Sequence, residues 1–336
     1  MTQRIYFDHA ATTPILPEAR AAMAAAMESW ANPSSPHAEG RKARALLEEA
    51  RAAIKDVLDW RHDVIFTSGA SEAVAIAASR ARVSGRIFGA TEHAIVPHEM
   101  GPGATTVPVG RDGIIDLEAL KAALEAGPAL VAIQQVNNET GVIQPMDEIG
   151  GIVRSAGSLL LGDCAQSAGK ISLPDADFIA VSAHKLGGPP GIGALLVRNL
   201  AALEPVGGQE KGYRRGTQDA PAAAAFARAL GSRAFADAMP RLSALRQRLD
   251  DGVRTAGGVI IAEESPRMPN IGAVALPGTS QASLLAQFDL AGFAVSAGSA
   301  CSSGKMKESA VLKAMGAEPD VATSFLRISF GPSTSE

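Results

Sequence analysis

The stretch "FIAVSAHKLGGPPGIGALLV", residues 178–197, decides the fold class of this chain. Two apolar runs, 178–181 and 191–197, flank a segment of small, polar and glycine residues that carries Lys185. Neither run alternates apolar with polar residues, and continuous apolar runs are typical of strands that are buried on both faces of a sheet. We therefore predict two buried strands joined by a loop that places a lysine at the end of the first.

The same pattern continues outward along the chain. Apolar runs predict further strands at 63–68, 85–90, 129–136 and 158–163. Segments with helical periodicity stand between or before them, at 40–58, 71–81, 116–127 and 146–157. This alternation predicts an α/β fold with a mostly parallel sheet flanked by helices.

The pattern changes near residue 219. A long helical stretch (219–256) leads into short apolar segments, which predict a smaller α+β domain. The predicted division is a large domain at 14–240 and a small domain made of 1–13 and 241–336.

Composition limits the class of protein. The 336 residues are 46% hydrophobic and 20% charged, with a net charge of −4, so no basic surface for nucleic acid or for membranes is expected. Aromatic residues make up only 4%, which also disfavours stacking on nucleic acid bases. The two cysteines do not form a disulfide framework, no run is long enough to span a membrane, and the histidines lack metal-ligand spacing. We predict a soluble cytoplasmic protein without a metal.

Candidate functional residues follow the predicted strands, because ligands of open α/β sheets bind beyond the carboxyl ends of the strands. Lys185 follows the strand at 178–181, where burial would make its amine nucleophilic. Ser182 and His184 beside it offer donors for a phosphate. A solvated loop lysine would explain Lys185 equally well if this segment stood alone.

Four other strand ends carry polar residues. Asp163 follows a buried strand, where it is either a partner for a cationic ring nitrogen or a helix cap or salt-bridge residue. Ala70 and Ser71 open a helix after a glycine turn, which is either an anion site or a plain N-cap. His93 and Asn138 could each be structural, as a core histidine and a turn residue. Together these residues supply a Schiff-base lysine, a carboxylate, phosphate donors and an imidazole, which is what pyridoxal phosphate (PLP) requires.

Ten ordered motifs resemble the cysteine desulfurases of the nitrogen-fixation and iron–sulfur-cluster type, in the class V aminotransferase family of fold type I PLP enzymes. They are "YFDHAATTP", "NPSSPHAEGRKAR", "FTSGASEA", "TEHAIV", "NNETGVIQP", "DCAQSAGK", "SAHKLGGPPGIGAL", "GGQEKGYRRGTQD", "GSACSS" and "FLRISFG". The chain departs from the family pattern at Ser71, where threonine is usual, at Ala73 and Val74, and at "GTQD". None of these departures removes a group expected to contact the cofactor.

The resemblance implies a role for each site residue. Lys185 would bind PLP covalently and move the substrate α-proton, and His93 would stack on the ring and assist acid–base steps. Asp163 would pair with the ring nitrogen. The remaining contacts would come from Gln166 and Asn138 at the ring hydroxyl, from Ala70, Ser71, Ser182, His184 and Thr217 of the second subunit at the phosphate, and from Arg327 and Asn32 at the substrate.

The resemblance also gives a role to Cys301, which stands among glycine, serine and lysine residues in a segment expected to be a mobile loop, about 296–307. Cys301 would take the sulfur of L-cysteine as a persulfide, leave L-alanine, and pass the sulfur to an acceptor or an iron–sulfur scaffold protein. The resemblance further implies a homodimer. A selenocysteine lyase, another class V enzyme and a degenerate partner-binding paralogue remain alternatives.

Overall fold

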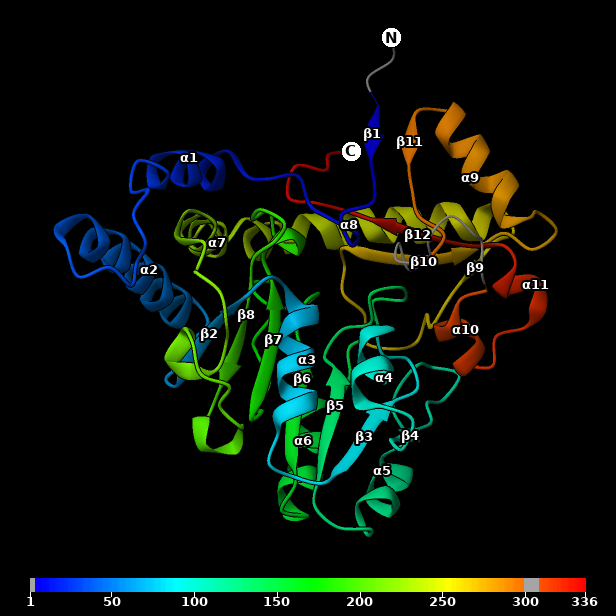
Figure 1. The fold of residues 1–336 in the computed structure, drawn as a ribbon. Helices are drawn as coiled ribbons and strands as arrows, with labels where there is room; N and C mark the ends of the chain where they lie inside the picture. The colour runs from blue at the N-terminus through cyan, green and yellow to red at the C-terminus, as the bar shows by residue number, and fades with distance from the viewer. Residues whose placement is uncertain (1–3, 299–307) are drawn as a thin grey trace.

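A seven-stranded sheet forms the centre of the computed structural model, which describes residues 4–298 and 308–336 (Figure 1). Its strand order is β2-β8-β7-β6-β5-β3-β4. The strands are β2 (Asp63–Thr67), β3 (Gly85–Gly89), β4 (Thr105–Val107), β5 (Ala129–Gln134), β6 (Leu159–Asp163), β7 (Phe178–Ser182) and β8 (Gly193–Val197). Strands β7, β6, β5, β3 and β4 run parallel, whereas β8 is antiparallel to both β7 and β2. The predicted mostly parallel sheet is confirmed.

Both faces of this sheet are buried, as the continuous apolar runs predict. In β2, Val64 and Phe66 pack into the core on one face and Ile65 packs into the core on the other. The first face is covered by α2 (Ala38–Val57), α5 (Leu117–Leu124), α6 (Met146–Ser155) and α7 (Ala220–Gly231). The second is covered by α3 (Ala70–Arg80) and α4 (Ile95–Met100). Helix α1 (Pro17–Ala26) packs on α7.

A smaller antiparallel sheet, in the order β12-β10-β9, lies above the carboxyl ends of the central strands (Figure 1). Its strands are β9 (Val259–Ile260), β10 (Ile271–Ala275) and β12 (Phe325–Ser329), and a separate parallel pair joins β1 (Ile5–Tyr6) to β11 (Phe293–Ala294). The helices of this part are α8 (Ala234–Thr255), α9 (Gln281–Leu290), α10 (Ala310–Ala314) and α11 (Pro319–Ala322). The carboxyl ends of the central strands therefore face the small sheet.

The helical stretch expected at 219–256 is two helices rather than one. Helix α7 ends at Gly231, and α8 begins after Arg233, whose backbone is left-handed with φ +56°. The predicted domain boundary after residue 240 falls inside α8, and the division into domains stays a prediction. Short 3₁₀ turns complete the fold at η1 (Ala183–Lys185), η2 (Leu200–Ala202) and η3 (Glu210–Gly212). Within the described ranges, no helix is long and apolar enough to cross a membrane.

Candidate active site

A cavity of about 440 Å³ lies where the carboxyl ends of the parallel strands face the small sheet. Ten of the residues that the sequence analysis singles out line it together. They are Ala70, Ser71, His93, Asn138, Asp163, Gln166, Ser182, His184, Lys185 and Arg327. Residues from six separate regions of the sequence thus meet in one site, because the strands that carry most of them end at the same edge.

Lys185 is the last residue of turn η1, directly after β7. Its Nζ donates to the carbonyl oxygens of Ala10 (2.7 Å) and Ala11 (2.9 Å). The N-terminal segment also bonds to the backbone of the same turn, since the Thr13 N–H donates to the His184 carbonyl (2.8 Å). The N-terminal segment therefore forms one wall of the site and holds the lysine amine at the cavity.

Asp163 ends strand β6 and faces His93 and Lys185. Burial raises the pKa of Asp163. The Ala165 N–H, which donates to Asp163 Oδ1 (2.9 Å), opposes that rise, and so do His93 and Lys185. Burial lowers the pKa of His93 below its usual 6.5, so its imidazole is neutral at pH 7. Since His93 Nδ1 accepts from the Ile95 N–H (3.3 Å), the neutral ring carries its proton on Nε2.

The turn between β2 and α3 has the features of an anion site. The N-cap of α3 is Gly69, which makes no side-chain cap bond, so the alternative of Ser71 as a plain N-cap is wrong. The helix N-terminus and the exposed Ser71 side chain lie at the cavity beside Ser182 and His184. Burial lowers the pKa of His184 to about 4, so its ring is neutral and bonds to Thr12 Oγ1 (3.2 Å). Helix dipole, hydroxyls and a neutral imidazole together suit a phosphate.

Arg327, in the middle of β12, is 1% exposed and reaches the cavity from the small sheet. Its Nη2 donates to Asp8 Oδ1 (2.8 Å), and its Nη1 donates to the Asn138 carbonyl (2.9 Å). Within the described residues its Nε is buried without a hydrogen-bond partner. Asp8 was not predicted as a site residue, although it stands in the quoted motif "YFDHAATTP".

Gln166 and Asn138 complete the polar lining. Gln166 Nε2 donates to the Ala10 carbonyl (2.8 Å), and its Oε1 is buried with no partner in the described ranges. Asn138 lines the cavity. The side chain of the preceding residue, Asn137, accepts from the N–H groups of Glu139 and Thr140. Asn137 is therefore a turn residue, and Asn138 is the one that faces the site.

Three predicted residues are not among those that line the cavity. Asn32 and Thr217 are exposed and lie outside it in this chain, and Cys301 lies outside the described residues. Gln134 lines the cavity but was not predicted, because it belongs to the apolar run of β5 and carries no motif signal. Cys164 is fully buried, and burial raises the pKa of its thiol. Among the described side chains, no group of three His, Cys, Asp or Glu residues is placed to hold a metal.

Comparisons with known proteins agree with this arrangement. The model of the family "Aminotransferase class-V" matches residues 5–336. A cysteine desulfurase of Cereibacter sphaeroides is 34% identical, covering 93% of this chain and 87% of its own, and an IscS-like cysteine desulfurase of Mycobacterium tuberculosis is 36% identical, covering 98% and 92%.

Solved structures give the same result. A NifS-like protein from Rickettsia africae has a TM-score of 0.91 at 30% identity, covering 99% of this chain and 95% of its own. A structure described as SspA in complex with cysteine has a TM-score of 0.83 at 27% identity, covering 98% and 100%. This chain therefore belongs to the class V aminotransferase family, among its members of the cysteine desulfurase type.

Proposed function

We propose that this protein is a PLP-dependent cysteine desulfurase, which converts L-cysteine to L-alanine and keeps the sulfur as a persulfide on Cys301. One observation carries the proposal: Lys185, Asp163, the N-terminus of α3 and Arg327 meet in one cavity of about 440 Å³. The cysteine desulfurases among the relatives direct the choice of substrate.

The residues that line the cavity fit PLP. Lys185 would hold its carbonyl carbon, Asp163 its ring nitrogen, and Ser71, Ser182, His184 and the α3 N-terminus its phosphate. The buried Gln166 Oε1, unpartnered within the described ranges, supplies an acceptor for the ring hydroxyl. When bound, PLP would supply an electron sink for bond cleavage at the substrate.

The chain's own groups would orient the substrate and move its protons. The Arg327 guanidinium, with a buried Nε that has no partner in the described ranges, suits the planar carboxylate of an amino acid. The neutral His93 can accept a proton near Asp163, and the Lys185 amine can accept one at the α-carbon. Four hydrogen bonds join the N-terminal segment to Lys185, Gln166 and His184 and hold this segment in place as one wall of the cavity.

Sulfur transfer would balance without an external oxidant. The bond between the cysteine Cβ and its sulfur breaks, a sulfur–sulfur bond to Cys301 forms, and the protons of the reactants complete L-alanine. The described residues that flank 299–307 lie near the cavity. A β-carbon on Gly298 would lie 3.2 Å from Glu139 Oε2, the Ser309 hydroxyl donates to that same oxygen, and Glu139 is adjacent to Asn138.

The proposal includes a cytoplasmic homodimer that passes sulfur to an acceptor protein for iron–sulfur cluster or thio-cofactor synthesis. The exposure of Thr217, outside the cavity of its own chain, supports a role for Thr217 of the partner subunit at the phosphate. Asn32 is also exposed, and we propose that it lies near the substrate in the dimer.

Purified protein loaded with PLP and given L-cysteine should release L-alanine in amounts equal to the sulfide recovered with a thiol reductant. Without the reductant, alanine formation should stop after about one turnover, because the persulfide is not discharged. Alanine formation from L-cysteine without any sulfur bound to the protein would contradict the proposal and favour a lyase. Preference for selenocysteine would favour a selenocysteine lyase.

A further inference from the structure

The loop at 206–218 has an unusual backbone. Four of its glycines have positive φ, at Gly207, Gly208, Gly212 and Gly216. Two residues with side chains, Glu210 and Lys211, are also left-handed, with φ +50° and +57°. Such a conformation is unfavourable for residues that carry a β-carbon and persists only where surrounding contacts enforce it. Side-chain contacts must therefore hold the loop in this conformation at Glu210.

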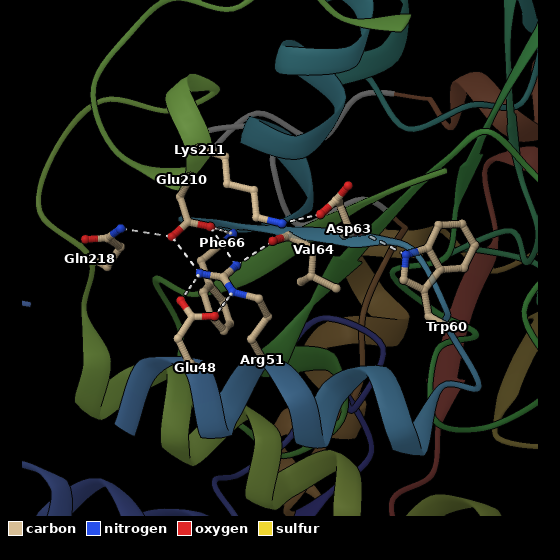
Figure 2. Close-up of polar contacts among 9 residues, drawn as sticks. All are labelled: Glu48, Arg51, Trp60, Asp63, Val64, Phe66, Glu210, Lys211 and Gln218. Carbon is tan, nitrogen blue, oxygen red and sulfur yellow. Dashed lines mark hydrogen bonds and ion pairs between the residues drawn. The ribbon is translucent and has the colours of Figure 1, made fainter. Parts of the chain in front are cut away.

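The carboxylate of Glu210 is the group that fixes it (Figure 2). Its side chain is fully buried, and the Arg51 side chain that pairs with it is 10% exposed. Arg51 donates to both oxygens, at 2.8 Å to Oε2 and 3.1 Å to Oε1. The Phe66 N–H donates to Oε2 (2.8 Å), so the loop is attached to helix α2 and to strand β2 through one carboxylate.

The fourth hydrogen bond of the Glu210 carboxylate connects it to the end of the loop that carries Thr217. Gln218 Nε2 donates to Glu210 Oε1 (3.0 Å), and Gln218 directly follows the exposed Thr217. A second ion pair connects the same loop to the turn between β2 and α3, since Arg214 Nε donates to Glu72 Oε1 (3.0 Å) and the other oxygen of Glu72 accepts from the Ser68 N–H. Contacts of Arg214 and of Gln218 thus fix the loop on both sides of the exposed Thr217.

We propose that Glu210 is a positioning residue for the cofactor phosphate: it attaches the loop to α2 and β2 so that Thr217 projects to the site of the other subunit. This inference rests on the proposed function, because it needs PLP and a dimer. Glu210 itself does not touch the cavity, and it acts through Gln218 and Thr217.

The test compares affinities for PLP and for pyridoxal, which lacks the phosphate, by titration of the visible absorption of the bound cofactor. Glu210→Gln should weaken PLP binding about tenfold, the size expected for one lost hydrogen bond to a charged group. Binding of pyridoxal should stay within about twofold, because Thr217 has no phosphate to contact. Lys211→Met is the matched control, since it removes only the neighbouring ion pair with Asp63 and should change neither affinity.

Because Glu210→Gln disturbs a buried charge pair, Gln218→Met serves as a second variant that leaves the pair intact. It should shift the ratio of PLP to pyridoxal affinity in the same direction, by a smaller factor. A purely structural role would lower the thermal midpoint but leave this ratio unchanged, and an unchanged ratio in both variants would overturn the inference. If the unmutated protein itself forms no visible band with PLP, it is the proposed function that fails.

Mixed dimers test the action on the other subunit. With Lys185→Ala and Glu210→Gln on the same chain, the remaining Lys185 site receives the altered loop and should lose its preference for PLP. When the two changes are on different chains, the remaining Lys185 site receives an unaltered loop and should keep its preference for PLP. The opposite pattern would overturn the inference.

Discussion

The ion pair of Arg51 and Glu210 and the polar lining of the candidate site both contain buried polar groups, and they differ in how completely the hydrogen bonds of these groups are satisfied. In the cluster of Arg51 and Glu210, all three guanidinium nitrogens and both carboxylate oxygens have partners. In the candidate site, Gln166 Oε1 and Arg327 Nε are buried without partners in the described ranges. Both clusters contain buried charge, so burial alone does not distinguish them.

The difference separates architecture from binding. A buried polar atom without a partner is costly, and it persists in a native protein where a ligand or water meets it. A saturated charge pair has no capacity left for a ligand, so it acts by holding the loop that carries Glu210 in place. On this view, variants of the site should lose activity and keep stability, whereas variants of the saturated cluster should lose stability first.

The largest expected effect is on turnover in Lys185→Ala. Alanine formation from L-cysteine should fall below detection, because Lys185 is the one lysine among the described residues that line the cavity, while thermal unfolding should change little. Full alanine production in this variant would end the assignment of Lys185.

Asp163→Ala should lower kcat by a factor of about 10² to 10⁴ and weaken retention of PLP, because the ring nitrogen loses its counter-charge. Asp177→Asn is the control. Asp177 lies near the other end of β6, where its Oδ2 accepts from the Leu160 N–H (2.9 Å), so its loss should affect stability and leave the rate unchanged. A near-normal rate in Asp163→Ala would mean that Asp163 only caps the turn at Ala165.

Arg51→Met should lower the free energy of unfolding by about 3 kcal/mol or more, because it leaves the fully buried Glu210 carboxylate without its partner. The control is Lys211→Met on the same loop, whose ion pair is about half exposed and should contribute at most about 1 kcal/mol. Denaturant unfolding measures both. Equal, small losses would break the contrast between the two clusters.

The smallest effect concerns Lys170, which packs over the Phe235 ring (4.5 Å) with no hydrogen-bond partner for its Nζ in the described ranges. Burial, together with the charge of Lys185, lowers the pKa of Lys170 from 10.5 to about 7. The folded state therefore disfavours the protonated amine, and its full cost applies below pH 7 and fades as pH rises to 10.5.

Lys170→Met should accordingly raise the free energy of unfolding at pH 6, and the gain should disappear near pH 11. The neighbouring His9, whose pKa burial and Lys170 lower to about 4, should titrate closer to its usual value in this variant. Denaturant unfolding across this pH range measures the gain, and a loss of stability at pH 6 would show that the amine makes favourable contacts.

Much of this arrangement could be predicted from the sequence, because the strand ends carry their own signal. Continuous apolar runs indicated a sheet buried on both faces, and Asp163, Lys185 and His93 were found by following each run to its end. Contacts between distant segments could not be predicted this way. Nothing local to Asp8 indicates that it pairs with Arg327, and nothing local to Glu210 indicates that Arg51 lies beside it.

The reversed direction of β8 and the break at Arg233 have the same explanation. An apolar run has the same pattern in either direction, so it predicts a buried strand but not whether that strand is parallel or antiparallel to its neighbour. The segment 219–256 is rich in alanine on both sides of Gly231 and Ser232, so its composition predicts helix without showing that the left-handed Arg233 divides it into two.

The central claim is that L-cysteine gives its sulfur to Cys301, and mass spectrometry of proteolytic peptides tests it most directly. The PLP-loaded protein is treated with L-cysteine in the absence of reductant, and each cysteine-containing peptide is weighed. The account predicts the mass of one added sulfur atom on the peptide with Cys301, none on the peptide with the buried Cys164, and no added sulfur in Lys185→Ala. Added sulfur mainly on Cys164, or alanine production with no sulfur on Cys301, would contradict it.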